Sequence, residues 1–202
     1  MKRLLIASNN EGKINEIRQV LSALSYDIFS MKEMGLDFTI VEDQPDFEGN
    51  SYKKAYEVSN KTGEIVLADD SGLEVEALGN KPGVHSSRFA GEYSTDEENN
   101  RKLLSLMREV PLERRRARFR CVMTMYWPNG FYLQTEGICP GRIGFAPTGA
   151  NGFGYDPLFI LDGFQKTMAQ LTIEDKNKIS HRAMALKALL DLLRAYEQTN
   201  IY

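Results

Sequence analysis

Hydrophobic positions along the chain follow two spacings, one typical of strands and one typical of helices. Short stretches rich in apolar residues predict strands over residues 3–7, 27–30, 65–68 and 73–75. Apolar residues three or four apart predict helices over 14–24 and 47–62, and a final helix after Ser180 with Ala183, Leu186, Leu189, Leu190 and Leu193 as its apolar stripe. Thr95 and Glu98 have capping-box spacing, which predicts another helix start.

The segment from Arg116 to Trp127 has an apolar residue at every second position, which puts residues 117, 119, 121, 123, 125 and 127 on one face and predicts a strand. Pro128-Asn129-Gly130 then turns the chain into a second strand over 131–138, so the two form a hairpin. The basic residues of 114–118 fit a solvated strand edge. Strands and helices are mixed throughout, which indicates an α/β or α+β fold.

Length and charge narrow the range of functions. The 202 residues suffice for one domain, or two closely joined lobes, with a real core. A net charge of -3 argues against a surface for nucleic acid, which would be basic. Two widely spaced cysteines predict neither a disulfide framework nor a zinc site. No apolar stretch has transmembrane length, and no signal peptide is evident, so we expect a cytoplasmic protein.

Candidate chemistry begins with two adjacent carboxylates, Asp69 and Asp70, which follow the apolar run 65–68. Carboxylates at a strand end can project into a cleft while their backbone stays paired. Such a pair suits Mg²⁺, a hard cation that takes oxygen ligands and keeps waters for substrate phosphates. The alternative is an ordinary turn, because Asp, Ser and Gly dominate turns for local reasons.

A polar loop, residues 8–13, joins the first strand to the first helix. Unpaired amides and the helix dipole favour an anion there, and Lys13 adds a full charge. The loop lacks the glycine and hydroxyl pattern of a Walker A motif. A capped helix with a solvated lysine remains the alternative.

Two C-terminal clusters complete the candidates. Residues 149–157 combine three glycines with Phe153 and Tyr155, whose flat faces suit either base stacking or core packing. Three cations, Lys176, Lys178 and Arg182, crowd the predicted start of the final helix, which favours an anionic ligand over solvent, and His181 lies beside them. The other histidine, His85, fits an ordinary packed or exposed side chain.

Together these motifs resemble one family, the inosine triphosphate pyrophosphatases, also called XTP/dITP diphosphatases. The resemblance spans almost the whole chain. It is carried by Ser8-Asn9-Asn10-Glu11-Gly12-Lys13, Asp69-Asp70-Ser71-Gly72-Leu73, Pro82-Gly83, Ser86-Ser87-Arg88-Phe89-Ala90-Gly91, Phe153-Gly154-Tyr155-Asp156-Pro157 and Ser180-His181-Arg182. It implies an α/β fold with a long mixed central sheet flanked by helices, and two lobes with the active-site cleft between them.

The resemblance also implies chemistry: water attacks a purine nucleoside triphosphate, releasing pyrophosphate and a nucleoside monophosphate, with Mg²⁺ or Mn²⁺ as cofactor. It implies a homodimer. We expect Asp70 to be the general base, with Glu42, Asp69 and Asp70 as metal ligands. Glu42 fits a solvated acidic loop equally well.

The expected substrate contacts divide between phosphates and base. The resemblance implies that the loop Ser8, Asn9, Asn10, Glu11, Gly12 and Lys13 holds the phosphates, with Lys54, Ser71 and Lys176 as further contacts. It places the base against Phe153 within the Phe153, Gly154, Tyr155 and Asp156 motif, with Asp156, His181 and Arg182 around the base edge. Arg182 can only donate hydrogen bonds, so it suits a 6-keto oxygen and leaves an adenine amino group without an acceptor.

Two alternatives stay open. A nucleotide sensor would keep the pocket without turnover, although a pure binder gains little from acids beside phosphates. A phosphohydrolase of modified nucleotides, as in the related Maf-like proteins, is the other.

Overall fold

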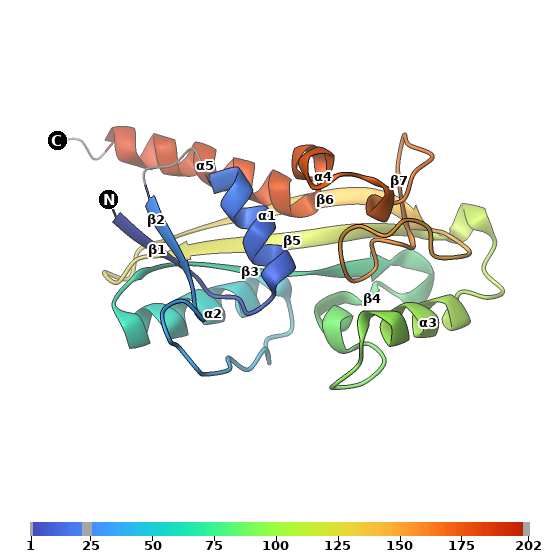
Figure 1. Cartoon of the computed structure of the whole chain (residues 1–202), viewed down its shortest axis with the longest axis horizontal. Helices are drawn as coiled ribbons and strands as arrows, with labels where there is room; N and C mark the ends of the chain where they lie inside the picture. The colour runs from blue at the N-terminus through green and yellow to red at the C-terminus, as the bar shows by residue number, and fades with distance from the viewer. Residues whose placement is uncertain (1, 22–25, 200–202) are drawn as a thin grey trace. The chain divides into compact units, whose positions relative to one another are not determined.

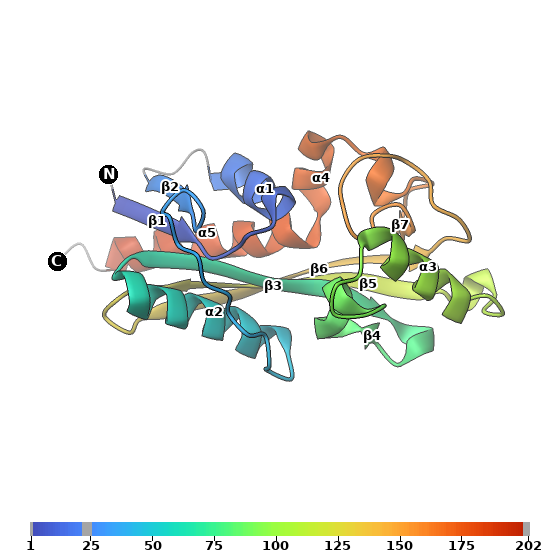
Figure 2. The same cartoon turned by 60° about the horizontal axis from the view of Figure 1, so that its bottom comes forward.

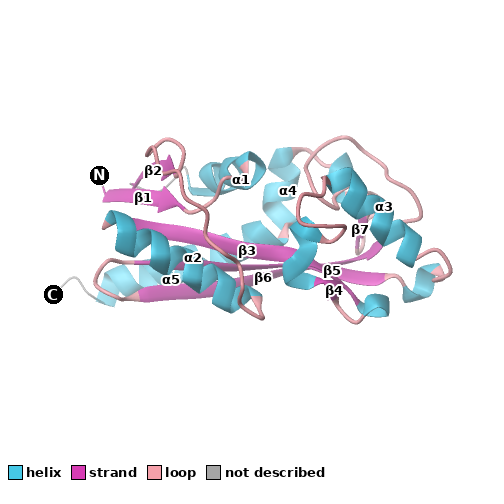
Figure 3. Cartoon of the chain, turned by 90° about the horizontal axis from the view of Figure 1, so that it is seen from below, coloured by secondary structure: helices cyan, strands magenta, loops and turns pink. Residues whose placement is uncertain are grey.

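The chain forms two compact units in the computed structural model, which describes residues 2–21 and 26–199 (Figure 1). Unit 1 comprises the described residues of 1–70, 121–137 and 182–202, and unit 2 comprises 71–120 and 138–181. Three long strands contribute to both units, and they are plain in Figure 3: β3 (Ile65–Val75), β5 (Arg116–Tyr126) and β6 (Tyr132–Ile143).

The remaining elements belong to one unit each. Unit 1 holds β1 (Lys2–Ile6), α1 (Glu11–Leu21), β2 (Tyr26–Ser30), α2 (Phe47–Thr62) and α5 (His181–Thr199), whose first residue is assigned to unit 2. Unit 2 holds β4 (Lys81–Pro82), α3 (Asp96–Leu106), β7 (Phe159–Leu161), α4 (Ile173–Ile179) and the short 3₁₀ helices η1 (Glu76–Leu78), η2 (Gly83–Arg88), η3 (Leu112–Arg114) and η4 (Met168–Gln170).

The sheet is mixed, with strand order β2-β1-β3-β5-β6-β7 and β4 beside β3. β1 pairs in parallel with β2 and β3, and Leu5 lies opposite Val66 in that register. β4 and β7 pair antiparallel with β3 and β6. The predicted mixed sheet flanked by helices is confirmed.

Unit 1 is layered, with helices on both faces of its strands. α1 and α5 lie on one face and α2 on the other (Figures 1 and 2). Leu4 and Ile6 pack with α1 and α5, whereas Leu5 and Ala7 pack with α2, as strand alternation requires. Unit 2 has its own core, in which Leu103 and Met107 of the α3 region pack with Phe119 and Phe159.

Most predicted elements are confirmed. α2 spans the predicted residues, and α3 begins with the predicted capping box of Thr95 and Glu98. α1 begins three residues earlier than expected because Asn10 Oδ1 accepts a hydrogen bond from Lys13 N at 3.1 Å. Leu24, the last apolar residue predicted for this helix, lies outside the described residues.

Two predictions about strands are wrong, one about where a strand ends and one about which strand lies at a sheet edge. The expected strands over 65–68 and 73–75 are one continuous strand, β3, and Asp69-Asp70-Ser71-Gly72 forms no turn. The basic run 114–118 does not lie at a sheet edge, because β5 pairs between β3 and β6. Within it Arg115 is buried and donates to the carbonyls of Met107, Val110 and Gly144.

None of the helices in the described ranges combines the length and apolar character needed to cross a membrane.

Candidate active site

Asp69 and Asp70 lie next to each other in β3, so their side chains point to opposite faces of the sheet. Asp69 lies on the face covered by α1 and α5. Its Oδ2 is 3.0 Å from Lys13 Nζ and 3.2 Å from an Arg182 guanidinium nitrogen. Burial opposes ionisation of Asp69, but the charges of Lys13 and Arg182 outweigh it and lower the pKa of this carboxyl.

Arg182 is held by a second carboxylate from the same face. Its guanidinium forms an ion pair with Glu16 of α1, and Arg182 and Glu16 are both almost fully buried. The two carboxylates raise the pKa of Arg182 despite its burial. The buried residues Glu16, Asp69 and Arg182 and the half-buried Lys13 therefore form one network of two acids and two cations.

Asp70 lies on the opposite face, beside α2. Its carboxylate accepts a hydrogen bond from Asn50 Nδ2 at 3.0 Å and lies 3.6 Å from Lys54 Nζ. Lys54 also contacts Glu42 Oε1 at 2.5 Å. Burial raises the pKa of Asp70, and the nearby Glu42 adds to that effect while Lys54 opposes it. This face therefore offers a buried carboxylate with increased proton affinity beside a cation.

The predicted metal ligands separate accordingly. Glu42 and Asp70 share the Lys54 ammonium, whereas Asp69 is engaged by Lys13 and Arg182. In the described part of the chain no group of three or more His, Cys, Asp or Glu side chains is arranged to hold a metal ion. Two carboxylates still fit Mg²⁺, which is commonly bound through one or two carboxylates, substrate phosphates and waters. The contact with Lys54 indicates that a positive charge is accommodated between them.

The N-terminal loop is shaped by its own side chains. Ser8 Oγ accepts a hydrogen bond from Asn10 N at 3.1 Å, and Asn10 in turn caps α1 through Lys13 N. Asn9, Asn10 and Glu11 are exposed, and Ser8 and Gly12 are half-buried. The loop therefore presents a helix N-terminus, with Lys13 in the first turn of α1. Ser71, the predicted phosphate contact after Asp70, is half-buried in β3.

In unit 2 the ring of Phe153 is part of a charged arrangement. Lys176 Nζ lies 4.7 Å from the Phe153 ring centroid and 2.6 Å from Asp156 Oδ2. The same Asp156 oxygen accepts a hydrogen bond from Phe153 N at 3.1 Å. The structure thus groups Lys176 with the aromatic motif, whereas phosphate contact was predicted for it. Lys176 and Asp156 neutralise each other in a buried position.

The other aromatic groups have structural partners. Tyr155 is buried in the core of unit 2 and its hydroxyl donates to Ser86 O at 2.8 Å. The His181 ring stacks on Phe119 with centroids 4.8 Å apart. Of the two motif aromatics, only Phe153 is partly exposed, so it is the one suited to meet a base.

The cations expected at one helix start lie in two different helices, α4 and α5. Lys176 lies in α4, a helix that the sequence analysis did not predict, and basic side chains in a last turn complement the helix dipole. Only His181 and Arg182 begin α5. The electrostatic argument for an anion there is therefore wrong, because Glu16 and Asp69 already balance Arg182.

Four residues that make polar contacts at these groups were not predicted from the sequence. Glu16 could have been found, because it lies three residues after Lys13 and therefore near it on α1. Asn50 gave no pattern of its own. Asp96 and Asn100, which bind the backbone of Gly154, lie in the helix predicted from its capping box, and that prediction gave them no role at a site.

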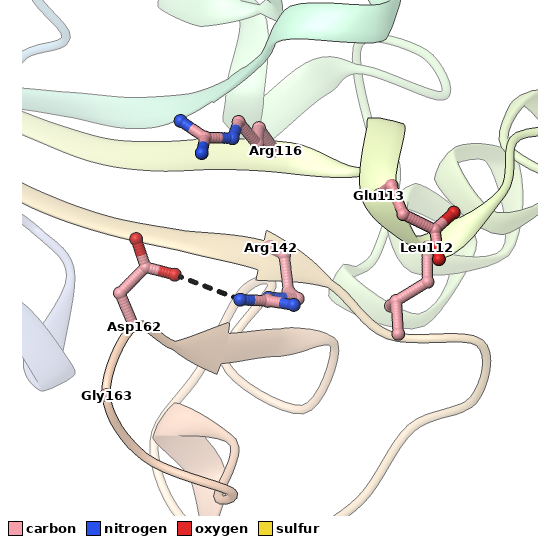
Figure 4. A pocket seen from close by; sticks show the side chains of 6 residues that line it. All are labelled: Leu112, Glu113, Arg116, Arg142, Asp162 and Gly163. Carbon is pink, nitrogen blue, oxygen red and sulfur yellow. Dashed lines mark ion pairs between the residues drawn. The ribbon is translucent and has the colours of Figure 1, made fainter.

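A separate cavity of about 390 Å³ lies in unit 2 and shares no residue with the candidate site (Figure 4). Its lining consists of Leu112, Glu113, Arg116, Arg142, Asp162 and Gly163. Arg142 points toward Asp162, with 3.6 Å between nitrogen and oxygen. The lining holds two arginines and two acids, so it has no net charge that would select an ion.

Comparison with known proteins agrees with this arrangement of motifs. The model of the Ham1 family matches residues 4–192. A protein of Desulforamulus reducens named dITP/XTP pyrophosphatase is 47% identical over 95% of both chains. One of Bacillus subtilis with the same name is 45% identical over 96% of this chain and 98% of its own.

Solved structures extend the likeness to three dimensions. The Ham1 protein of Staphylococcus aureus is 40% identical with a TM-score of 0.86, over 96% of this chain and all of its own. A HAM1 protein from Coxiella burnetii is 37% identical with a TM-score of 0.87 over the same shares. Since the family model and these relatives cover nearly the whole chain, the protein belongs to the Ham1 family.

Proposed function

We propose that the protein hydrolyses non-canonical purine nucleoside triphosphates, namely dITP, XTP and ITP, to the nucleoside monophosphate and pyrophosphate. The name shared by the two relatives, at 45% and 47% identity, supports this reaction. The structural observation that carries the proposal is Asp70, a buried carboxylate of raised pKa beside the cation Lys54.

The proposed chemistry follows from these groups. Asp70 accepts a proton from water as the water oxygen bonds to phosphorus, and the bond between the α- and β-phosphates breaks to release pyrophosphate. A raised pKa makes Asp70 a better proton acceptor than an ordinary carboxylate, and general-base catalysis typically contributes about 10²–10⁴-fold in rate. Asn50 orients the carboxylate through its hydrogen bond.

Phosphate charge is neutralised by the protein's own cations in this proposal. Lys54 lies beside Asp70, and the charge of Lys13, at the N-terminus of α1, also acts on that carboxylate. The two cations would offset the charge that develops during phosphoryl transfer, where positioning and electrostatics supply most of the catalysis. The amides of the loop 8–13 bind phosphate oxygens, because a helix N-terminus attracts anions. Ser71 adds a hydroxyl.

A Mg²⁺ or Mn²⁺ ion is the proposed cofactor, with Glu42 and Asp70 as its protein ligands. Such an ion would neutralise phosphate oxygens and lower the pKa of bound water. Asp69, which we predicted as a third ligand, is proposed instead to fix Lys13 and Arg182.

For the base, we propose that Phe153 stacks on the purine, with Lys176 over one face of the Phe153 ring and Asp156 fixing the backbone N of Phe153. The roles predicted for His181 and Arg182 at the base edge rest on the family resemblance. We also propose a cytoplasmic homodimer, an expectation that rests on the same resemblance.

The test is product analysis with ITP, XTP, dITP, GTP and ATP, each with and without Mg²⁺, separating pyrophosphate from orthophosphate. We expect pyrophosphate, mainly from ITP, dITP and XTP and only with metal. Orthophosphate as the main product would favour another phosphohydrolase. Binding without turnover would favour a nucleotide sensor.

A further inference from the structure

We propose that α3 positions the Phe153 ring for purine stacking, through Asp96 and Asn100, which bind the two backbone polar groups of Gly154. This role makes Asp96 and Asn100 positioning residues, since neither is proposed to touch the substrate. The inference rests on the proposed function, because it is Phe153 that is proposed to stack on the purine.

Asp96 and Asn100 make two hydrogen bonds to one residue, Gly154, and we call this pair of contacts the α3 grip. Gly154 N donates to Asp96 Oδ2 at 2.6 Å, and Asn100 Nδ2 donates to Gly154 O at 2.9 Å. Residues 96 and 100 are four apart, so they lie on the same face of α3. The helix therefore binds both the amide and the carbonyl of the residue directly after Phe153.

The loop needs such a grip because its own backbone is permissive. Gly149, Gly152 and Gly154 all have positive φ values, at +90°, +76° and +63°. Glycine-rich backbone loses more conformational entropy than other sequences when it is fixed in one conformation. Asp156 holds Phe153 N from the C-terminal side. With the α3 grip, the backbone on both sides of the Phe153 side chain is fixed, and so is the direction of its ring.

α3 is itself held in place by core packing and by its capping box. Leu103 and Met107 anchor it in the core of unit 2, and its first turn is closed by the capping box. Asn99 binds the segment 87–90 from the same helix, through Ser87 O at 3.0 Å and Ala90 N at 2.7 Å. Figures 1 and 2 show α3 beside the loop that follows β6.

The burial of the Asn100 amide is unfavourable for the stability of the fold. Asn100 is 9% exposed, and its amide oxygen finds no hydrogen-bond partner among the residues that the structure describes. A buried polar group left unpaired is destabilising. An apolar residue would serve packing at this place, so the contact with Gly154 O accounts for the asparagine.

The experiment compares Asp96→Ala and Asn100→Ala with Glu97→Ala and Arg101→Ala. The controls lie on the same helix, 83% and 70% exposed, and pair with each other instead of the loop. Glu97 also matches Asp96 as an acid in the first turn. Asp96→Asn keeps an acceptor oxygen and serves as the conservative rescue. Kinetics with ITP and Mg²⁺ are measured alongside hydrogen exchange of the segment 152–157.

We expect Asp96→Ala to raise KM about tenfold or more and Asn100→Ala about threefold to tenfold, from the loss of a charged and a neutral hydrogen bond respectively. We expect kcat to stay within about twofold, because stacking stabilises the bound substrate and the transition state alike. Exchange of segment 152–157 should accelerate in both variants. The controls should match the parent, and Asp96→Asn should recover most of the affinity.

Accelerated exchange with unchanged KM would overturn the inference, because the grip would then have no effect on substrate. A lower melting temperature with unchanged KM and exchange would also overturn it, in favour of a purely structural role. A parent protein without turnover of ITP or XTP would overturn the proposed function and the purine contact, whereas unchanged exchange in Asp96→Ala would overturn the grip itself.

Discussion

At the scale of single residues, Asp69 and Asp70 show how one strand gives neighbouring carboxylates opposite properties. The pKa of Asp69 is lowered by Lys13 and Arg182, and that of Asp70 is raised by burial. Groups whose environments push their pKa values apart are suited to different roles. Asp69 is thus a fixed charge, and Asp70 is the better proton acceptor.

Asp70→Asn tests that assignment, because an amide keeps the shape but cannot take the proton. We expect kcat to fall about 10²–10⁴-fold. The affinity for Mg²⁺ should also fall, because Asp70 is a proposed ligand of the ion. Asp43→Asn is the matched control. Asp43 is an exposed acid that pairs with Lys53 of α2, as Asp70 lies beside Lys54 of the same helix. Activity within a few-fold of the parent would move the base to Glu42 or Asp69.

Glu16→Ala tests the buried network on the other face. It leaves Arg182 with one carboxylate fewer in a buried place, and removing one partner of a buried pair typically costs about 3–5 kcal/mol. Glu11→Ala, an exposed acid in the same helix, should cost no more than about 1 kcal/mol. Denaturant unfolding measures the free energy of unfolding of both variants. Equal losses would contradict a stabilising role of the buried ion pair between Glu16 and Arg182.

At the scale of elements, patterning located most helices and strands but not the place of the carboxylates. A capping box and a strict alternation are local signals, and α3 and β5 follow them. Asp69 and Asp70 look like a turn because their neighbours are turn formers. They stay in a strand because cations distant in sequence, Lys13, Lys54 and Arg182, satisfy them. No local pattern reports such partners.

The turn after β2 provides a prediction about pH. Hydrogen bonds from Ser30 N and from the Arg18 side chain lower the pKa of Glu33 from 4.5 to about 2. A lowered pKa stabilises the fold fully above pH 4.5, and that contribution is lost as the pH falls toward 2. NMR titration should place the Glu33 midpoint near 2, and Ser30→Ala should raise it, because the variant removes the hydrogen bond that Ser30 Oγ donates to Glu33 at 2.9 Å. A midpoint near 4.5 in the parent would contradict these contacts.

Gly152 gives a prediction for the loop before Phe153. A Cβ at this position would lie 2.0 Å from Asp156 Oδ2, at a φ of +76°. Gly163 has a similar φ of +79° with open space, so Gly163→Ala should cost only the backbone strain of about 1–2 kcal/mol. Gly152→Ala should cost more and also raise KM, because Asp156 must leave Phe153 N. Equal stability of the two variants would contradict the clash.

At the scale of the whole molecule, the two units share strands but each contains one thiol. Cys121 lies in unit 1 and Cys139 in unit 2, and both are buried. Burial raises the pKa of Cys121 to about 12 and that of Cys139 to about 11, so neither thiol is reactive at neutral pH. Each thiol therefore reports the opening of its own unit.

The single-thiol variants Cys121→Ser and Cys139→Ser allow the opening of each unit to be measured by thiol labelling at increasing denaturant concentration. We expect the remaining thiol in either variant to stay unmodified in the folded protein. We expect both to become reactive at the same denaturant concentration, because β3, β5 and β6 run through both units. Labelling at clearly different concentrations would mean that the units unfold independently.

The division of unit 1 among three stretches of chain also bears on biosynthesis. Its core needs Ala185, Leu186, Leu189 and Leu193 of α5 as well as Leu4 and Ile6 of β1. A ribosome that has released the first 70 residues has therefore delivered Lys13 and Lys54 without the helix that completes the core of unit 1. Unit 2 requires nothing beyond residue 181, so during translation its core can close first, although its first residue follows 70 residues of unit 1.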